Sequence, residues 1–360
     1  MKRARRSRSK KVGMPPGSLI HVGEVKTKHS ELTLFRYDAQ QLSESNATSL
    51  AALDIKARNE EEVLWLNVHG LHDPELMRHI GEAFHLHPLV MEDILNTDQR
   101  PKLDVYEDHL FIVTRFFSYD KQSVQIESEQ VSIVLGHNFV LTFQERPTGS
   151  FDPVRERLRA SKGHIRSSDA GYLAYTLLDV IVDRYFIVLE QIGDDCDYLE
   201  ESLLHHPGEY MLQNIHKLKR ETMELRRAVW PLREVINSLV RNESGYFPHD
   251  TVLYLRDVYD HTVHFIESLE ALRDLLAGML DIYLSSVSNR VNMEVRALTV
   301  VAMLFMPATL IAGIFGMNFV HMPWLEHRDG FWLALALMGG IGSFMALIFW
   351  RRQWLSRRLF

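Results

Sequence analysis

The sequence predicts an α+β membrane protein with a cytoplasmic α/β domain, a long helical stalk and two C-terminal transmembrane helices. Three observations support this fold class. Strand-like and helical segments alternate over the first 150 residues, an unbroken helical pattern follows later, and two uncharged segments, 297–315 and 331–350, lie near the end. Each uncharged segment is long enough to cross the hydrocarbon core of a bilayer as a helix.

The composition indicates a mostly soluble protein with an acidic body. Of the 360 residues 46% are hydrophobic, too few for a chain that crosses a membrane many times. The formal net charge is −7 although seven of the first eleven residues are basic. Nucleic-acid phosphates require a basic surface, so we exclude nucleic acid as a partner, whereas divalent cations suit an acidic protein.

Residues 1–16 are predicted to form a basic, disordered tail. No apolar segment follows the basic run, as a secretory signal would require. Such a run is typical of a solvated tail, and the alternative is attraction to anionic membrane lipid. Cys196 is the only cysteine. It therefore excludes an intramolecular disulfide and a cysteine-based zinc site, which fits a cytoplasmic location.

Residues 17–150 are predicted to form the α/β domain. Between its strands, residues 73–84 and 88–96 have helical spacing, and Asp73 before Pro74 predicts a helix N-cap. Five runs rich in Val, Ile, Phe and Thr predict the strands. These runs are Leu32–Tyr37, Val63–Val68, Leu110–Phe117, Gln130–Leu135 and Phe139–Phe143.

Residues 151–250 are predicted to form a helical hairpin. Apolar residues at helical spacing predict two long helices over 152–205 and 209–242, separated by a helix stop at 205–208. The hairpin tip is acidic. Its acidic residues are Glu190, Asp194, Asp195, Asp197, Glu200 and Glu201.

Residues 251–316 are predicted to form a stalk helix that continues into the first transmembrane helix. Apolar residues recur every three or four positions after Asp250, and no proline interrupts them before Pro307. A helix from Asp250 to Phe315 would be about 100 Å long. An apolar stripe of this length implies that several copies of the chain pack together around the helix.

The distribution of arginine predicts the membrane topology. Arg290 and Arg296 precede the first span, and the tail at 351–360 contains four further arginines. The link between the spans, 317–330, carries only one arginine and two acidic residues. The positive-inside rule therefore places both termini in the cytoplasm and the link outside, with residues 331–350 as the second transmembrane helix.

One face of the first span is a candidate lining for an ion path. Its residues are Leu298, Ala302, Met306, Thr309 and Gly313, with Asn292 and Val295 upstream and Gly316 and Asn318 downstream. This face has no carboxylate. Because Mg²⁺ loses its water reluctantly, amide and carbonyl oxygens suit a hydrated ion better than a narrow carboxylate ring. The alternative is ordinary helix packing through small residues.

Several segments in order resemble the CorA family of magnesium channels. Gly316-Met317-Asn318, at the end of the first span, is the signature of that family. Three residues alone are a weak signal, but the similar segments cover nearly the whole chain. They are His87–Asn96, Gln99–Lys102, Phe151–Arg157, Val229–Glu234, Arg256–His261, Tyr283–Arg290, Leu298–Thr299, Phe305–Pro307, Ile311–Phe319 and Met322–Pro323.

The resemblance implies a homopentamer whose first transmembrane helices line a pore. Gly316, Met317 and Asn318 would form an outer selectivity filter, and the pore-lining face described above would contain a hydrophobic gate near Leu298. Val295 departs from the methionine that is familiar near this position in bacterial members. The resemblance also implies that Arg351 and Arg352 form a basic collar at the cytoplasmic mouth.

The resemblance further implies regulatory Mg²⁺ between subunits. Asp93 and Asp257 match one site, and Glu92 and Asp179 match a neighbouring one. Two carboxylates that face each other across an interface repel unless a cation joins them, so bound metal would hold the ring shut. The alternative is that these acidic residues only cap helices or form ordinary ion pairs.

The expected function is a membrane channel that admits Mg²⁺, with Co²⁺ and Ni²⁺ as further candidates, in the cell (inner or plasma) membrane. The membrane potential would drive influx, and cytoplasmic Mg²⁺ would gate it. One alternative is a zinc-directed relative, against which Met317 argues. Another is a non-conducting, membrane-anchored scaffold. No phosphate-binding loop or Ser/His/Asp motif appears, so we do not expect an enzyme.

Overall fold

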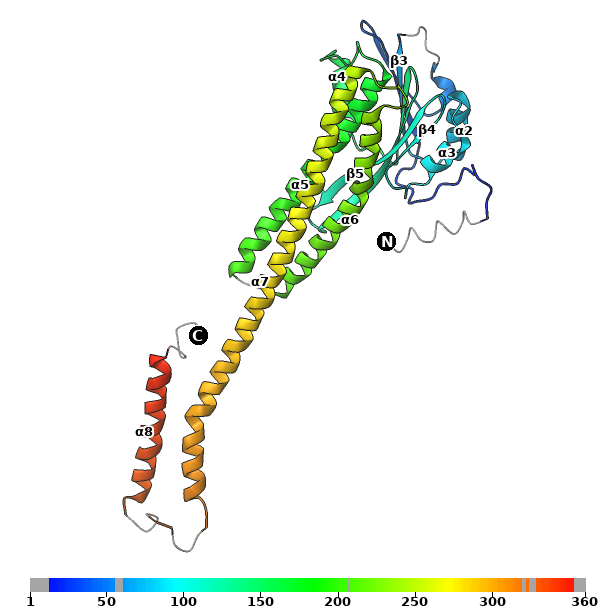
Figure 1. The fold of residues 1–360 in the computed structure, drawn as a ribbon. Coiled ribbons are helices and arrows are strands. Elements are labelled where there is room, and N and C mark those ends of the chain that lie inside the picture. Colours follow the sequence, from blue (N-terminus) through cyan, green and yellow to red (C-terminus); the bar gives the residue numbers. More distant parts are fainter. Residues whose placement is uncertain (1–12, 56–60, 206–207, 319–321, 324–327, 353–360) are drawn as a thin grey trace. The chain divides into compact units, whose positions relative to one another are not determined.

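The computed structural model describes residues 13–55, 61–205, 208–318, 322–323 and 328–352 (Figure 1). Contacts divide the chain into two compact units, one of residues up to 204 with 208–279, and a second that includes residues 280–360. Most of the predicted N-terminal tail, half of the link between spans and the last eight residues lie outside the described residues.

The first unit contains a seven-stranded mixed sheet. The strands are β1 (Glu31–Tyr37), β2 (Leu42–Ala47), β3 (Val63–His69), β4 (Lys102–Val105), β5 (Leu110–Asp120), β6 (Gln125–Leu135) and β7 (Phe139–Gln144). Their order is β2-β1-β3-β7-β6-β5-β4, and only β3 and β7 pair in parallel. The two helices α2 (Pro74–Ala83) and α3 (Pro88–Leu95) lie between β3 and β4 in the chain.

All five predicted strands are confirmed, whereas β2 and β4 were not predicted. These two strands form the two edges of the sheet. Most side chains of β2 are exposed, and β4 has no fully buried residue. An edge strand with little buried surface has no need for alternating apolar residues, so its sequence carries no strand pattern.

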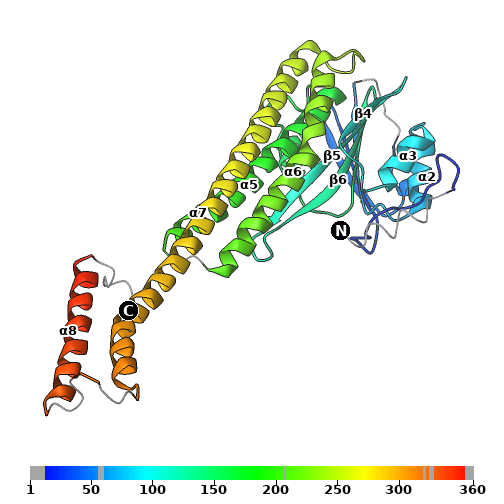
Figure 2. The ribbon, with the colours of Figure 1, turned by 60° about the horizontal axis from the view of Figure 1, so that its bottom comes forward.

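One face of the sheet packs against α2 and α3 (Figure 2). Residues from alternate positions of the strands meet these helices in a continuous core. Its members include Leu34, Leu66, Val68, Met77, Ile80, Val90, Ile94, Phe111, Val113, Leu141 and Phe143. The predicted N-cap is confirmed, because the Asp73 carboxylate accepts from the backbone N–H groups of Glu75 and Leu76, at 3.1 Å each.

The opposite face of the sheet carries large aromatic side chains. Trp65 is fully buried, stacks on Phe35 at a centroid distance of 5.1 Å and meets Phe151 edge-on at 6.1 Å. Its indole N–H donates to the Thr142 hydroxyl at 3.0 Å. Phe151 leads into α4 (Asp152–Arg159), so this cluster attaches the helical half of the unit to the sheet.

The prediction of one helix over 152–205 is wrong. The structure contains α4, then a break, and then α5 (Ala170–His205). Within the break Ser161 and Gly163 adopt positive φ angles of 48° and 69°, which a helix does not accommodate. Asp169 then accepts a hydrogen bond from the Tyr172 N–H at 2.9 Å, as an N-cap does.

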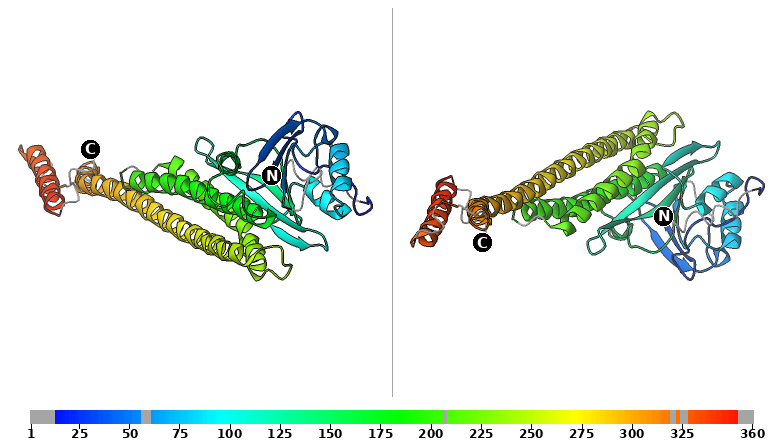
Figure 3. Two further views of the ribbon diagram at one scale, coloured as in Figure 1. Left: turned by 90° about the horizontal axis from the view of Figure 1, so that it is seen from above. Right: turned by 90° about the horizontal axis from the view of Figure 1, so that it is seen from below.

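The helices α5, α6 (Glu209–Arg241) and α7 (His249–Phe315) lie side by side in the first unit (Figure 3). Tyr185 of α5 packs on Phe265 of α7 at a ring-centroid distance of 5.3 Å. Arg226 of α6 pairs with Glu270 of α7 at 2.5 Å. The continuous helix predicted from Asp250 to Phe315 is therefore confirmed as α7, and its first half belongs to this layer.

The second unit contains the rest of α7 from Leu280 and the helix α8 (Gly330–Arg351). Both contain a segment apolar enough to cross a membrane, and only 6% of each such segment is buried within the chain. Leu298, Phe305 and Met306 are each about two-thirds exposed or more. A helix that is apolar around most of its surface requires lipid or other helices around it.

We expect Asp73→Ala to destabilise α2 locally, by about 1 kcal/mol, because two backbone donors lose their acceptor. Hydrogen–deuterium exchange of the full chain should show faster exchange at Glu75 and Leu76. Asp73→Asn keeps an acceptor oxygen and should preserve most of the protection. Equal exchange in all three proteins would contradict the role of the cap.

Candidate functional site

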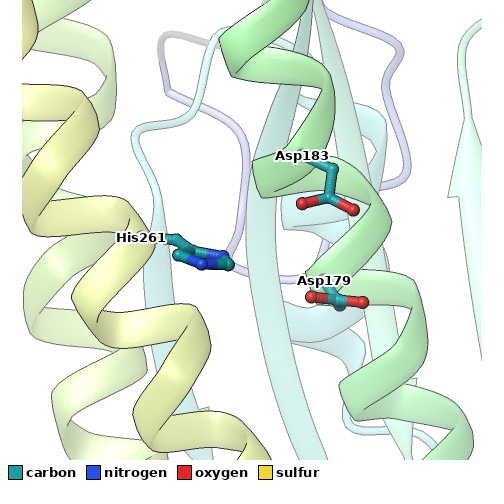
Figure 4. A group of neighbouring side chains, drawn as sticks. All are labelled: Asp179, Asp183 and His261. Carbon is teal, nitrogen blue, oxygen red and sulfur yellow. The ribbon is translucent and has the colours of Figure 1, made fainter.

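A group of possible metal ligands lies between α5 and α7 in the first unit. Asp179 and Asp183 are one helical turn apart on α5, and His261 projects from α7 toward them (Figure 4). Each offers one ligand atom, and these atoms all lie within 4.8 Å of one another. Asp257 is one turn before His261, with its carboxylate 3.9 Å from the imidazole Nε2.

This group concentrates negative charge in a partly buried place. Burial, and after it the charge of the nearby Asp183 carboxylate, raise the pKa of Asp179 to about 6. The charges of Arg157 and His261 act in the opposite direction. In the described part of the chain, neither Asp179 nor Asp183 forms a hydrogen bond or an ion pair. A divalent cation would relieve both the repulsion and the cost of burial.

The other two predicted metal residues lie on α3 and have partners of their own. The Asp93 carboxylate accepts from Lys102 Nζ at 2.6 Å and from the Gln99 side-chain amide. Glu92 accepts from the backbone N–H of Gly17. Within one chain, His261 lies beside both Asp179 and Asp257, so these two acidic residues are neighbours. Glu92 and Asp93 of the same chain do not belong to this group. The predicted pairing across subunits stays a prediction.

Asp183 and His261 were missed at the sequence level. A usable signal was present, because Asp179 and Asp183 are four residues apart, as are Asp257 and His261. Two such pairs on neighbouring helices place four ligands at one level. An acidic residue four positions from a histidine is common on solvated helices, however, so the spacing has meaning only once the two helices are known to face each other.

In the second unit, part of the predicted pore-lining face of α7 forms a shallow apolar groove. Ala302, Met306, Thr309 and Gly313 line it together with four large apolar side chains. The Thr309 hydroxyl donates to the Phe305 carbonyl at 2.9 Å, so the polar group is satisfied within its own helix. Leu298, on the same face, is 71% exposed. This face has no partner within the described residues.

A polar groove precedes the apolar one on α7. Asn292, which was predicted, lines it with Asp281, Ser285 and Asn289, which were not. Their spacing of three or four residues places them on one side of the helix. Val295 lies between the two grooves and is 57% exposed. The second unit therefore presents a side that changes from polar to apolar along α7.

The helix α7 ends immediately before the Gly-Met-Asn tripeptide. The Gly316 N–H donates to the Ala312 carbonyl at 2.9 Å and the Met317 N–H donates to the Ile314 carbonyl at 3.2 Å. Asn318 follows as an exposed residue outside the helix. A Cβ at position 316 would lie 3.1 Å from the Ala312 oxygen, so glycine permits the close turn. At the other helix, Arg351 is the last residue of α8 and Arg352 follows it, both exposed.

Comparisons with known proteins agree on one family. The family described as "CorA-like Mg2+ transporter protein" matches residues 60–352. The "Cobalt/magnesium transport protein CorA" of Thermotoga maritima is 44% identical, over 96% of this chain and 98% of its own length. The "Putative metal ion transporter YfjQ" of Bacillus subtilis is 33% identical, over 81% of this chain and 90% of its own length.

Solved structures share the fold. The CorA magnesium transporter from Methanocaldococcus jannaschii covers 91% of this chain and 99% of its own, with a TM-score of 0.75 and 21% identity. The full-length CmaX protein covers 92% and 100%, with a TM-score of 0.70 and 22% identity. These two likenesses extend over both units and confirm the predicted fold class of an α/β domain, a long helix and two apolar C-terminal helices.

We expect the effect of Asp179→Asn on stability to depend on pH. The folded unit favours the protonated Asp179 carboxyl. The protonated carboxyl therefore contributes fully to the free energy of unfolding below the unfolded pKa of 3.8, and this contribution is lost as pH rises through about 6. The asparagine removes that loss. In metal-free buffer the variant should gain more in unfolding midpoint near pH 7.5 than near pH 4.5. Asp260→Asn, at an exposed position of α7, is the control. An equal change at both pH values would contradict the assigned pKa.

Proposed function

Because the chain belongs to the family of CorA-like Mg²⁺ transporter proteins, we propose that it is a channel for divalent cations in the cell membrane. Its principal substrate is Mg²⁺, with Co²⁺ and Ni²⁺ as further candidates. The observation that carries this proposal is the apolar end of α7, which terminates at Gly316-Met317-Asn318 and is followed by a second apolar helix. Influx follows the membrane potential, which supplies about 4–5 kcal/mol to a doubly charged ion at about −100 mV.

The channel is proposed to be a ring of identical subunits. Two membrane helices are too few to enclose a path within one chain, and the apolar grooved face of α7 has no partner there. Copies of α7 around a common axis would supply that partner, and α8 would face lipid. The resemblance implies five subunits. The distribution of arginine favours both termini, and the α/β unit, in the cytoplasm of a cell whose inner or plasma membrane holds the ring.

The ion path is proposed to run along the pore-lining face of α7. At the outer end, Gly316 and Asn318 offer carbonyl and amide oxygens to the water shell of a hydrated ion, with Met317 between them. Below this filter, Thr309 and Gly313 precede a narrower apolar stretch around Met306, Ala302, Leu298 and Val295. This stretch is a hydrophobic gate, and the path widens at the polar groove of Asn292. Arg351 and Arg352 form a basic collar near the cytoplasmic end.

Cytoplasmic Mg²⁺ is proposed to regulate the ring. Asp179 on α5 lies with Asp183 and His261, and the Asp257 carboxylate on α7 lies 3.9 Å from His261 Nε2. A second subunit would contribute Asp93 and Glu92 from its α3. The donor set of carboxylates suits Mg²⁺, and bound metal would join carboxylates that otherwise repel. When cytoplasmic Mg²⁺ falls, the repulsion returns and the subunits separate enough to open the path.

Asn318→Ala should abolish most Mg²⁺ uptake, because the filter loses the side chain that hydrogen-bonds the hydrated ion. Loss of about 1–3 kcal/mol at this position lowers the rate about 5- to 160-fold. Uptake in liposomes or in a transport-deficient cell measures it. Asn237→Ala, on α6, is the matched control. Uptake that is unchanged by Asn318→Ala would favour a non-conducting scaffold, and faster Zn²⁺ than Mg²⁺ uptake by the parent would favour a zinc transporter.

Asp257→Ala should weaken the protection from proteolysis that millimolar Mg²⁺ gives to the purified channel. In the variant the bound Mg²⁺ has one carboxylate ligand fewer, so a higher Mg²⁺ concentration is needed to hold the subunits together. Limited proteolysis over a Mg²⁺ series measures the shift. Asp260→Ala on the same helix is the control. A protease pattern that is identical to the parent at every Mg²⁺ concentration would argue against a metal role for Asp257.

A further inference from the structure

The exposed side of α6 carries a basic groove with no assigned role. His216, Lys219, Arg220, Met223, Glu224 and Arg227 line it, at helical spacing. Arg220 pairs with Glu224 at 3.1 Å, whereas Lys219 and Arg227 form no ion pair within the described residues. The groove therefore has an excess of positive charge. Met223 is 37% exposed and adds an apolar side chain to the groove.

The exposed side of α5 has the opposite charge. Glu190, Asp194 and Asp197 follow one another at intervals of four and three residues, and all three are exposed. Ile187 and Tyr198, on the same side, are 51% and 69% exposed. We call these five residues the acidic stripe. Asp194 pairs with Lys121 at 3.1 Å, while Glu190 and Asp197 form no ion pair among the residues that the structure describes.

The stripe and the groove lie at the same height along the helices. The tip of the β5–β6 hairpin contacts both: Lys121 binds Asp194 of α5, and the Ile126 N–H donates to Glu221 of α6 at 3.0 Å. The same tip also connects Tyr119 to Asp195 and the Ser123 carbonyl to Lys217. Since α5 and α6 run in opposite directions, Asp194 is level with about Arg220, and the stripe spans the height of the groove.

The two surfaces face different sides of the unit. Near their lower ends in Figure 1, α5 and α6 lie on either side of α7. Helix α6 packs against β4, β5 and β6, and Lys102 of the edge strand β4 binds Asp93 of α3. Helix α6 thus joins α7, through the Arg226–Glu270 pair, to the edge of the sheet at which β4 binds α3. A proposed metal contact from Asp257 of α7 to Asp93 of the next subunit therefore turns the α5 side of one copy toward the α6 side of the next.

We propose that the acidic stripe of one copy docks into the basic groove of the neighbouring copy. The partner is a second copy of this chain, and the inference rests on the ring that the proposed function requires. Rotation about the ring axis leaves heights unchanged, so surfaces that are level within one chain are also level between neighbours. The three acidic side chains then meet Lys219, Arg220 and Arg227, and Ile187 and Tyr198 cover Met223.

Cysteine cross-linking in the full chain tests this contact. The native Cys196 is buried, and burial raises the pKa of its thiol to about 12, so it should not react. The variant with Asp194→Cys and Arg220→Cys, reconstituted in lipid nanodiscs and oxidised, should give a ladder of covalent oligomers on a denaturing gel. The parent and each single variant should run as monomers on the gel. The contact joins position 194 of one copy to position 220 of the next, so a single variant has a cysteine on only one side of it.

A matched control has the second cysteine at the wrong height. Glu234 lies on the same exposed side of α6, about 21 Å further along the helix from Arg220, so Asp194→Cys with Glu234→Cys should give no ladder. If the protein is a ring by size but only the control pair or neither pair cross-links, the docking contact is overturned while the ring stands. If the protein is monomeric in lipid, the proposed function and this inference both fail.

Charge exchange gives an independent measurement. Arg220→Glu with Arg227→Glu should make the ring dissociate at a lower salt concentration than the parent, as followed by native mass spectrometry. Adding Asp194→Arg and Asp197→Arg to the same chain should restore much of the lost resistance, since the pairs re-form with opposite polarity. Loss of resistance without any restoration would contradict direct contact between the two surfaces.

Discussion

The structure depends on one constraint: the apolar surface of α7 and α8 cannot be buried by the chain itself. Only 6% of each apolar segment is covered within the described residues. Lipid can cover α8. The side of α7 instead carries a polar groove followed by an apolar groove with small residues, and contact with lipid alone would not require this order. The proposed assembly of copies around α7 would cover the apolar surface and create the ion path at the same time.

The same helix carries both proposed functional regions. Asp257 and His261 belong to the part of α7 that packs on α5, and the pore-lining face belongs to the part that continues from Leu280. No flexible loop interrupts the helix between them, since α7 is continuous from His249 to Phe315. In the proposed ring, a change in how the stalk helices pack could therefore reach the pore along α7 itself, without a separate relay.

The sequence predicted the strands and helices whose buried face produces a regular apolar pattern. It missed the elements that bury little surface or whose conformation depends on residues elsewhere in the fold. The five central strands and α7 were predicted because continuous apolar runs or long periodic stripes define them. The edge strands β2 and β4 were not, since they bury little. The break between α4 and α5 depends on a left-handed Ser161, which no propensity favours. At the site, resemblance identified Asp179 and Asp257, while Asp183 and His261 required knowledge that α5 and α7 face each other.

The ion pair between Lys102 and Asp93 makes the lysine an internal competitor for any metal at that carboxylate. An arriving cation must displace the ammonium group, and the energy of that exchange is subtracted from its binding. The affinity of the site for the cation is thereby weakened, although the site keeps all its carboxylate ligands. Weak affinity is what a sensor of an abundant ion needs, because a site that stays saturated at resting concentrations reports no change.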